Sequence, residues 1–287
     1  MSRIAYVNGR YVPHASAAVH IEDRGYQFAD GVYEVCEVKG GFIIDMRGHL
    51  NRLDRSLGEL SIQWPLHRSA LERILAEVVR RNRIRNGLVY LQVTRGVARR
   101  DHVFPGPNVR PALVITATRS DPKASDQMAA TGIDVITVPE NRWERVDIKT
   151  VGLLPNVLAR QQAKDAGAQE AWFVDKDGIV LEGSATNAWI VTQDGAIVTR
   201  DAERGILRGI TRTTLFEVAK KLGLKVVERG FTVDEALMAR EAFVTSATKT
   251  AISVISINGS SIGNGHPGSL ASALRGSFFD VAEKTPA

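Results

Sequence analysis

The pattern of apolar and polar residues along the chain predicts short β-strands linked by turns, interrupted by amphipathic helices. Residues 4–7 and 10–12 are strand-like and flank Asn8-Gly9, a pair that is typical of a tight hairpin. Further strands are expected at residues 31–38, 41–45, 88–94, 112–118, 133–138, 171–174, 179–181, 188–191 and 196–198.

Helical periodicity is clearest in two segments of the first half. Residues 49–60 place leucines three or four positions apart, and residues 69–81 carry their apolar side chains on one face. Helices are also expected at residues 155–166 and 211–222, the second followed by Gly223, where glycine commonly ends a helix. Because the strands are short and do not alternate regularly with helices, the pattern predicts an α+β fold and not a doubly wound sheet.

A polar stretch near the middle of the chain indicates the domain organisation. The length of 287 residues suits about two domains. Residues 120–131 begin with a polar run that Pro122 interrupts, and a new strand is expected directly afterwards. We therefore expect an N-terminal α+β domain at residues 1–119, an interdomain linker at residues 120–131 and a C-terminal α+β domain at residues 132–287.

One connection between expected strands is unusually long. Residues 97–109 have no periodicity of their own, and they contain two arginines, a histidine, a phenylalanine and two prolines. Loops of this length within a compact domain are usually either functional or disordered. The composition of this loop favours a defined shape and a function over a flexible linker.

Charge and composition narrow the classes of ligand. The net charge of +5 and the pI near 9.4 raise the question of nucleic-acid binding, and a basic cluster lies at Arg80, Arg81, Arg83 and Arg85. No aromatic interleaving and no known reader motif accompany this cluster, so a solvated helix end is the favoured interpretation. The basic residues are 27 arginines and ten lysines, which favours small anionic ligands, because arginine suits bidentate contacts with phosphate and carboxylate.

The single cysteine, Cys36, excludes an intramolecular disulfide and a cysteine-based zinc site, and its apolar neighbours predict a buried thiol. The N-terminal residues lack the continuous apolar core of a signal peptide, and no apolar run approaches the ~20 residues of a membrane span. We therefore expect a cytoplasmic protein that binds no metal, no membrane and no nucleic acid.

Lys149 is the first candidate for covalent chemistry. Val146 and Ile148 alternate with polar residues as in a strand, so Lys149 is expected at a strand end. A lysine at such a place is usually a solvated edge residue. The functional alternative is a lysine whose amine attacks a carbonyl group and forms a Schiff base.

Three further segments are candidates for cofactor binding. Glu182 ends an apolar strand, so it lies either in a plain turn or beside a ring nitrogen that needs an anionic partner. Gly209 and Thr211 stand where a helix begins, and free N–H groups there suit a phosphate, although a plain capped helix fits equally. Residues 244–248 form a small-residue turn that suits the same anion. An amine, a carboxylate and a phosphate site are together what pyridoxal phosphate requires.

Several longer motifs occur in a specific order along the chain. They are RGYQFADGVYEV at 24–35, HLNRL at 49–53, TRG at 94–96, DIK at 147–149, LEGS at 181–184 and GITR at 209–212. In this combination the chain resembles the class IV (fold type IV) pyridoxal-phosphate aminotransferases, and within them the D-amino acid transaminases. The resemblance covers nearly the whole chain, from Tyr6 to the region of Ser246. It implies the two-domain α+β fold of these enzymes.

The resemblance also implies roles for individual residues. Lys149 would hold the cofactor as a Schiff base and act as the acid–base in the 1,3-proton shift, and Glu182 would pair with the pyridine nitrogen. The phosphate contacts of Ile210 and Thr211 would run partly through backbone N–H groups. Relatives often carry a hydroxyl residue at the position of Ala247, so this contact is reduced to the backbone here. The remaining cofactor contacts are expected from Arg52, Ser184, Ile210, Thr211, Ser246 and Ala247.

Three residues carry the resemblance to the D-amino acid subgroup. In that subgroup a tyrosine on the GVYEV strand and an Arg-x-His on the long loop bind the α-carboxylate of the substrate, which corresponds to Tyr33, Arg100 and His102 here. A phenol, a guanidinium and an imidazole can all donate hydrogen bonds to one carboxylate. In the family this loop reaches into the site of the neighbouring subunit, so the resemblance implies a homodimer.

The resemblance implies a transaminase that moves the amino group of a D-amino acid, such as D-alanine, to a 2-oxo acid, such as 2-oxoglutarate, in two ping-pong half-reactions. Two alternatives share the cofactor: a branched-chain L-amino acid transaminase and an enzyme of the aminodeoxychorismate-lyase type. The branched-chain enzymes lack the Arg-x-His, which disfavours them. A basic nucleic-acid-binding protein is a remote alternative that rests on the arginine cluster and the pI.

Overall fold

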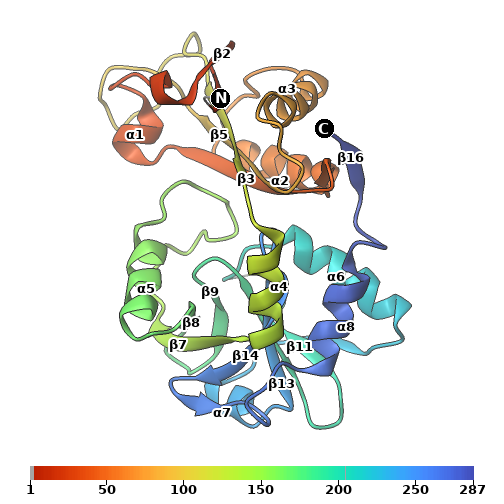
Figure 1. The fold of residues 1–287 in the computed structure, drawn as a ribbon. Coiled ribbons are helices and arrows are strands. Elements are labelled where there is room, and N and C mark those ends of the chain that lie inside the picture. Colours follow the sequence, from red (N-terminus) through yellow and green to blue (C-terminus); the bar gives the residue numbers. More distant parts are fainter. Residues whose placement is uncertain (1–2, 204) are drawn as a thin grey trace. The chain divides into compact units, whose positions relative to one another are not determined.

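The structure is a computed structural model that describes residues 3–203 and 205–287 (Figure 1). Over these residues it contains a seven-stranded sheet and a nine-stranded sheet, and the chain divides into two compact units. Unit 1 comprises the described residues up to Asp121 together with Ile148–Gly152 and Glu283–Ala287. Unit 2 comprises the described residues of Pro122–Asp147 and Leu153–Ala282.

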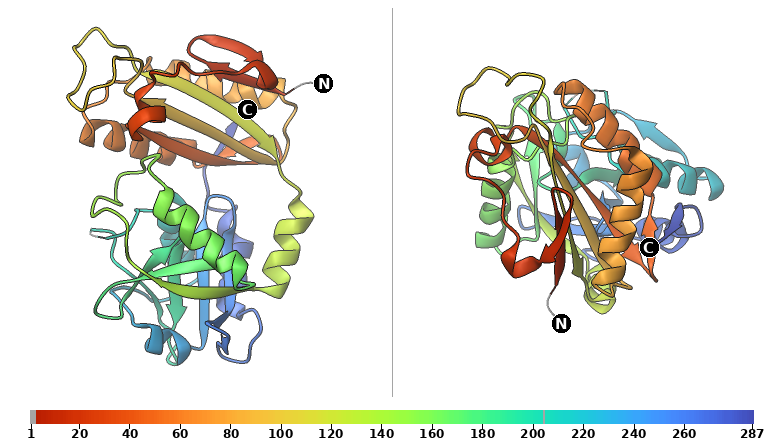
Figure 2. Two further views of the ribbon diagram at one scale, coloured as in Figure 1. Left: turned by 90° about the vertical axis from the view of Figure 1, so that its left-hand side faces the viewer. Right: turned by 90° about the horizontal axis from the view of Figure 1, so that it is seen from above.

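Unit 1 is an antiparallel sheet with the strand order β16-β4-β3-β5-β6-β1-β2, and α2 and α3 pack on one face of it (Figure 2). Its elements in chain order are β1 (Ile4–Val7), β2 (Arg10–Pro13), η1 (His14–Ser16), α1 (Arg24–Phe28), β3 (Gly31–Lys39), β4 (Phe42–Ile44), α2 (Met46–Glu59), α3 (Arg68–Arg81), β5 (Gly87–Thr94), β6 (Ala112–Arg119) and β16 (Lys284–Pro286).

The central strands of unit 1 bury every second residue, because the helices cover one face of the sheet. Along β3 the residues Val32, Glu34, Cys36 and Val38 are buried, whereas Tyr33 on the other face is half-buried. The predicted burial of the Cys36 thiol is confirmed. The helices contribute apolar side chains to the same core, among them Leu50, Leu53, Leu57, Leu71, Leu75 and Val78.

Unit 2 contains a mixed sheet with the order β12-β11-β10-β13-β14-β7-β8-β9, with β15 paired to β14. The N–H of Val180 in β9 donates to the carbonyl of Phe231, which follows β12, so the two ends of the sheet approach each other. The elements are α4 (Pro122–Thr131), β7 (Ile133–Pro139), α5 (Leu154–Asp165), β8 (Glu170–Val174), β9 (Val180–Gly183), β10 (Asn187–Val191), β11 (Ile197–Thr199), α6 (Ile210–Lys221), β12 (Val226–Glu228), α7 (Val233–Leu237), β13 (Glu241–Ser246), β14 (Thr250–Ile257), β15 (Ser260–Ser261) and α8 (Ser269–Phe278).

The strands of unit 2 are buried on both faces. One face contributes to an apolar cluster that includes Trp172, Val244 and Ile252, and the other packs under α5 through Ala171 and Phe173. Burial on both faces explains why these strands appear in the sequence as short continuous apolar runs without alternation.

The predicted α+β class is confirmed, and so are the longer predicted elements. The helices expected at residues 49–60 and 69–81 are α2 and α3, and those expected at residues 155–166 and 211–222 are α5 and α6, with ends shifted by a few residues. Gly223 follows α6 with a φ of +67°, a left-handed conformation that glycine adopts without strain. Among the described residues, no helix combines the length and the apolar character needed to cross a membrane.

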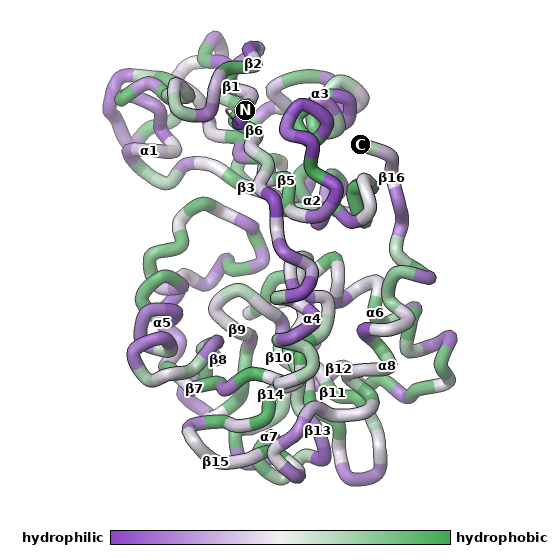
Figure 3. The backbone as a smooth tube through the Cα atoms, in the orientation of Figure 1, coloured by the Kyte–Doolittle hydropathy of each residue, from purple (hydrophilic) through white to green (hydrophobic). Residues whose placement is uncertain are grey.

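Some expected elements differ from the structure. Residues 120–131, predicted as a linker, form helix α4 over Pro122–Thr131. The residues of this helix are exposed or half-buried and its first half is hydrophilic (Figure 3), so its apolar pattern is weak. Val146 and Ile148, predicted to lie in a strand, lie in a turn and a bend. Of the predicted turn at residues 244–248, the first three residues belong to β13 and only the last two lie in a turn.

Candidate active site

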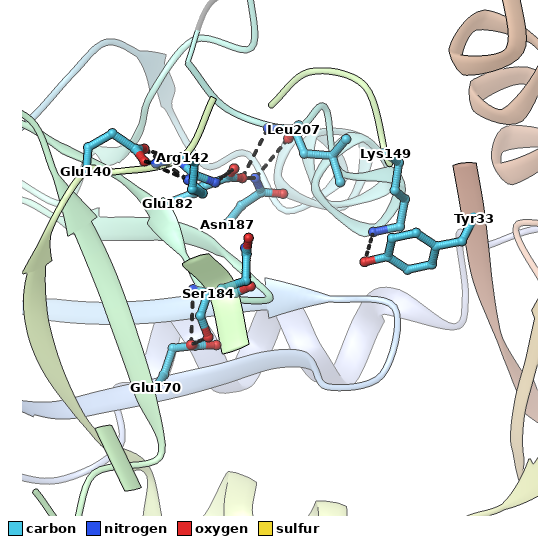
Figure 4. Close-up of polar contacts among 10 residues, drawn as sticks. Tyr33, Glu140, Arg142, Lys149, Glu170, Glu182, Ser184, Asn187 and Leu207 are labelled. Atoms are coloured by element: carbon cyan, nitrogen blue, oxygen red, sulfur yellow. Dashed lines mark hydrogen bonds and ion pairs between the residues drawn. The ribbon is translucent and has the colours of Figure 1, made fainter. Parts of the chain in front are cut away.

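Lys149 lies beside strand β3, although no strand leads up to it. Its carbonyl accepts the N–H of Tyr33 at 3.0 Å, and the next residue, Thr150, forms an isolated bridge with Val32. Its Nζ donates to the Tyr33 hydroxyl at 3.3 Å and lies 4.3 Å from the centre of that ring (Figure 4). The lysine predicted to anchor a cofactor and one residue predicted to bind a carboxylate are therefore neighbours within unit 1.

Tyr33 lies on the half-buried face of the sheet, together with side chains from the adjacent strand. The Tyr90 ring is 5.6 Å from the Tyr33 ring, and the Tyr90 hydroxyl donates to Oε1 of Gln92 at 2.7 Å. Burial, with a smaller effect of the nearby Tyr33, raises the pKa of Tyr90 to about 12. Tyr90 is therefore a neutral hydrogen-bond donor near neutral pH, and neither it nor Gln92 was predicted as a site residue.

Arg52 projects from α2 onto a buried carboxylate. Its Nε and Nη2 donate to the two oxygens of Glu34 at 2.7 and 2.8 Å, and Nδ1 of His49 lies 2.7 Å from Glu34 Oε2. Burial alone would raise the pKa of Glu34, but the charge and hydrogen bonds of Arg52, together with His49, lower it to about 2. The guanidinium predicted to bind a phosphate is thus oriented by an ionised glutamate. Glu34 and His49 lie inside the recognised motifs, yet their pairing with Arg52 was not predicted.

The long loop at residues 97–109 brings its two predicted site residues to one aromatic ring. The guanidinium carbon of Arg100 lies 5.0 Å from the centre of the Phe28 ring, and the His102 ring lies 5.4 Å from it. Both side chains belong to exposed residues, whereas Phe28, at the end of α1, is half-buried. The loop therefore presents a guanidinium and an imidazole together on the surface of unit 1.

In unit 2, Glu182 lies at the end of β9 and accepts hydrogen bonds from three directions. Nη1 of Arg142 donates at 2.6 Å, Nδ2 of Asn187 at 3.2 Å and the N–H of Leu207 at 3.1 Å (Figure 4). The Glu182 side chain is buried. A guanidinium and two amide donors around one buried carboxylate favour its ionised form.

Arg142 is itself fixed by a second carboxylate and by an aromatic ring. Its Nε and Nη2 donate to Glu140, the shortest contact being 2.5 Å, and its guanidinium carbon lies 4.3 Å from the centre of the buried Phe173 ring. Burial opposes the charge of Arg142, but Glu140 and Glu182 outweigh this and raise its pKa. Sequence reasoning missed Arg142, because the residue lies 40 positions before Glu182 in an irregular segment.

Ser184 follows Glu182, but its hydroxyl is engaged elsewhere. It donates to the fully buried Glu170 in a short hydrogen bond, and the Ser184 N–H reaches the same oxygen at 3.1 Å. Thr186 also donates to Glu170, at 3.1 Å. The predicted contact of Ser184 with a cofactor therefore concerns a residue that is already held on a buried carboxylate.

The start of α6 has the form of an anion site. Gly209 is the residue before the helix and provides no side-chain cap for the N–H groups that follow it, which include those of Ile210 and Thr211. A Cβ on Gly209 would lie 2.1 Å from Oδ1 of Asn187, so only glycine fits there. Helix α6 packs against β13, where Ser246 is the last residue before the turn that contains Ala247.

These features fit pyridoxal phosphate residue by residue. Unit 1 offers a lysine amine next to a tyrosine hydroxyl, and an arginine oriented by a buried carboxylate. Unit 2 offers a buried carboxylate for a protonated ring nitrogen, and a helix start without a side-chain cap for a phosphate. The fold and these groups define an enzyme of two α+β units with the equipment for pyridoxal-phosphate chemistry.

Comparison with known proteins identifies the family. The family model for amino-transferase class IV matches residues 31–257. The D-alanine aminotransferase of Bacillus licheniformis is 39% identical over 282 residues, which cover 97% of this chain and 98% of the relative. That of Staphylococcus aureus (strain MSSA476) is 36% identical over 278 residues, 97% of each chain.

Solved structures agree with this match. The branched-chain amino acid aminotransferase of T.th., solved with pyridoxamine 5'-phosphate, is 27% identical, with a TM-score of 0.90 over 98% of this chain and 94% of that chain. The Escherichia coli branched-chain enzyme reaches the same TM-score at 22% identity, over 98% of this chain and 95% of that chain, and shows the fold alone. The chain belongs to the class IV aminotransferase family. The family predicted from the sequence motifs is thereby confirmed.

Proposed function

We propose that this enzyme is a pyridoxal-phosphate-dependent transaminase that moves the amino group of a D-amino acid, such as D-alanine, to a 2-oxo acid, such as 2-oxoglutarate. The observation that carries the proposal is the position of the Lys149 amine, 3.3 Å from the Tyr33 hydroxyl. This contact brings a nucleophilic amine to a residue that can donate to a substrate carboxylate. The relatives named D-alanine aminotransferase, at 36–39% identity, support the substrate class.

Pyridoxal phosphate, when bound, withdraws electrons from the α-carbon of an amino acid and so allows its proton to leave. In this chain Lys149 is the group that moves that proton. Its Nζ would take the proton from the α-carbon and return it in the second part of the half-reaction. The Tyr33 hydroxyl, which accepts a hydrogen bond from Nζ, holds the amine on this face of the sheet.

Glu182 would keep a proton on the ring nitrogen of the cofactor, because an anionic neighbour favours the cationic form of that nitrogen. Arg142 and Asn187 hold the carboxylate of Glu182 in place. Arg142 thus has a double effect: it orients Glu182, and its positive charge favours the ionised carboxylate.

The phosphate would be bound by groups from both units. The N–H groups at the start of α6 and the backbone of the turn after β13 provide neutral donors, and Arg52 provides a positive charge. Ser184 would contribute through its position next to Glu182, since its hydroxyl proton is engaged by Glu170. The residues proposed to hold the phosphate are Arg52, Ile210, Thr211, Ser246 and Ala247.

Arg100 and His102, together with Tyr33, would bind the substrate α-carboxylate. We propose that they act in a homodimer, with the loop at residues 97–109 completing the site of the neighbouring subunit. The loop carries exposed apolar side chains, Val103 at 72% and Phe104 at 58% exposure, which a second copy of the chain would cover. A cytoplasmic location remains a prediction, consistent with the single free thiol of Cys36.

Two alternatives with the same cofactor keep support from their own observations. The matching solved structures named above are branched-chain enzymes, although at 22–27% identity against 36–39% for the D-alanine enzymes. An aminodeoxychorismate-lyase type of enzyme would release pyruvate without an amino acceptor. The nucleic-acid alternative loses its basis, because the exposed Arg80 and Arg81 both pair with Glu77 as ordinary residues of a solvated helix end.

Steady-state assays of the holoenzyme separate these functions. We expect transamination between D-alanine and 2-oxoglutarate, slower turnover of L-leucine, and no pyruvate release in the absence of an acceptor. Lys149→Ala should abolish the reaction, whereas the control Lys176→Ala, at an exposed turn residue, should leave it unchanged. A Lys149→Ala enzyme with the wild-type rate, or faster turnover of L-leucine than of D-alanine, would contradict the proposal.

A further inference from the structure

We propose that Phe28 is a positioning residue for the substrate carboxylate: its ring is a shared platform that orients Arg100 and His102, and Arg24 fixes the loop on that platform. This inference rests on the proposed function, in which Arg100 and His102 bind the α-carboxylate. Phe28 has no polar side-chain atom, so it would act through these two residues and not by touching the carboxylate as a donor.

The platform itself follows from the ring contacts of Phe28. The Arg100 guanidinium carbon lies 5.0 Å from the ring centre, within the range of cation–π attraction, and the His102 ring centre lies 5.4 Å away. Both side chains belong to exposed residues, so nothing else described by these contacts restricts their rotamers as closely. Restricting a long arginine before the substrate arrives reduces the entropy that binding must overcome.

Arg24 attaches the loop backbone to the same ring. This buried side chain donates through Nη1 to the carbonyl of Asp101 at 2.5 Å and to that of Val103 at 3.4 Å, which are the residues on either side of His102. Its guanidinium carbon lies 4.8 Å from the centre of the Phe28 ring. One arginine therefore fixes both the backbone at His102 and the platform beneath its side chain.

A second arginine holds the arrangement from the other side. Asp30 accepts a hydrogen bond from Nε of Arg24 at 2.8 Å and from Nε of Arg95 at 2.7 Å. The Arg95 guanidinium carbon lies 3.6 Å from the centre of the Phe104 ring, further along the same loop. The loop is thus held at Asp101, Val103 and Phe104, which bracket His102, by two arginines on one carboxylate.

The test compares Phe28→Leu with Arg100→Met and with a matched control. The control is Tyr11→Leu, which removes another aromatic ring of unit 1 that also contacts an arginine, Arg81, at 3.9 Å. The steady-state parameters of each holoenzyme are measured with D-alanine and 2-oxoglutarate. Two further readouts are the rate of trypsin cleavage after Arg99 and Arg100, and the visible spectrum and thermal midpoint of the holoenzyme.

For Phe28→Leu we expect the KM for both substrates to rise about tenfold, because both carry an α-carboxylate and each lost cation–π or ring contact weakens its orientation. The kcat should change much less. Trypsin should cut the loop severalfold faster, while the spectrum and thermal midpoint stay close to those of the wild type. Arg24→Lys retains the charge but not the forked donors, so it should show the same changes to a smaller extent.

Three results would overturn the platform. Arg100→Met with a raised KM but Phe28→Leu with wild-type KM values and loop cleavage would leave the carboxylate role standing and remove the positioning role. A Phe28→Leu enzyme that loses cofactor and thermal stability while Arg24→Lys behaves as wild type would show a merely structural role. If Arg100→Met itself leaves both KM values unchanged, the proposed carboxylate site fails, and the platform fails with it.

Discussion

At the scale of single residues, each half of the site contains a buried carboxylate that an arginine holds. Glu34 pairs with Arg52 in unit 1, and Glu182 pairs with Arg142 in unit 2. Burying a charge is costly unless it is paired and hydrogen-bonded, so such pairs orient their members more than they stabilise the fold. In both pairs one member is a proposed cofactor contact and the other member fixes its direction.

The pairing of Glu34 makes stability depend on pH in a defined direction. The folded-state pKa of Glu34, about 2, lies below the ordinary value of 4.5, so its contribution is complete above pH 4.5 and is lost as the pH falls towards 2. Glu34→Gln should lower the free energy of unfolding by about 3 to 5 kcal/mol at pH 7. The difference from the wild type should shrink as the pH falls below 4.5.

Urea unfolding at pH 7 and pH 3 measures both values. The exposed Glu217 on α6 provides the control, since Glu217→Gln removes an acid without such a pair and should give no pH-dependent difference. A Glu34→Gln effect of the same size at both pH values would show that the ionised pair is not its cause.

The site residues that the sequence predicted are those within recognisable local motifs, such as Lys149 and Glu182. Their supporting partners could not be predicted in the same way. Arg142 reaches Glu182 across 40 positions, and Glu170 meets Ser184 across 14. No local periodicity connects such pairs, because the sheet of unit 2 brings them together only when it forms.

At the scale of elements, the start of α6 depends on the absence of a side chain at Gly209. The Asn187 side chain occupies the space of a Cβ and donates to both Glu182 and the carbonyl of Leu207. The glycine thus connects the helix start, proposed for the phosphate, with the carboxylate proposed for the ring nitrogen.

Gly209→Ala should displace Asn187 and lower the free energy of unfolding by about 1 to 3 kcal/mol. Retention of the cofactor should fall in parallel, because the helix start and Glu182 are disturbed together. Gly58→Ala is the control: this exposed position of α2 has nothing within 4 Å of a Cβ, so alanine should stabilise by up to about 1 kcal/mol. Denaturation curves that do not distinguish the two variants would contradict the close approach at Gly209.

Among the elements, the amphipathic helices α2 and α3 were predictable because each keeps an apolar face over several turns. The shorter helices were not. Helix α1 (Arg24–Phe28) and helix α7 (Val233–Leu237) have five residues each, too few to show a period. The strand order in the two sheets likewise follows from long-range pairing that short apolar runs do not encode.

At the scale of the whole molecule, the proposal requires that the loop at residues 97–109 act on the neighbouring subunit. Apolar side chains remain exposed near it and on α5, where Leu154 is 68% and Leu158 is 58% exposed. Such surface is typical of an interface, and a homodimer would cover it with a second copy. The family resemblance predicted this arrangement, which composition and periodicity alone do not indicate.

Complementation tests the shared site. Lys149→Ala and Arg100→Met are each expected to be inactive or strongly impaired as pure dimers. In mixed dimers one site would combine an intact Lys149 with the intact loop of the other chain, so random assembly should restore about a quarter of the wild-type activity. Activity no higher than the sum of the two pure variants would show that the loop serves its own chain.

The central claim, a pyridoxal-phosphate enzyme that acts on D-amino acids, is tested most directly by the visible absorption spectrum of the purified holoenzyme. The spectrum is recorded before and after addition of D-alanine, and separately of L-alanine, without an oxo-acid acceptor. We predict a visible cofactor band that D-alanine bleaches and L-alanine leaves unchanged, and no such response in Lys149→Ala. A colourless protein, or bleaching by L-alanine in preference to D-alanine, would contradict the account.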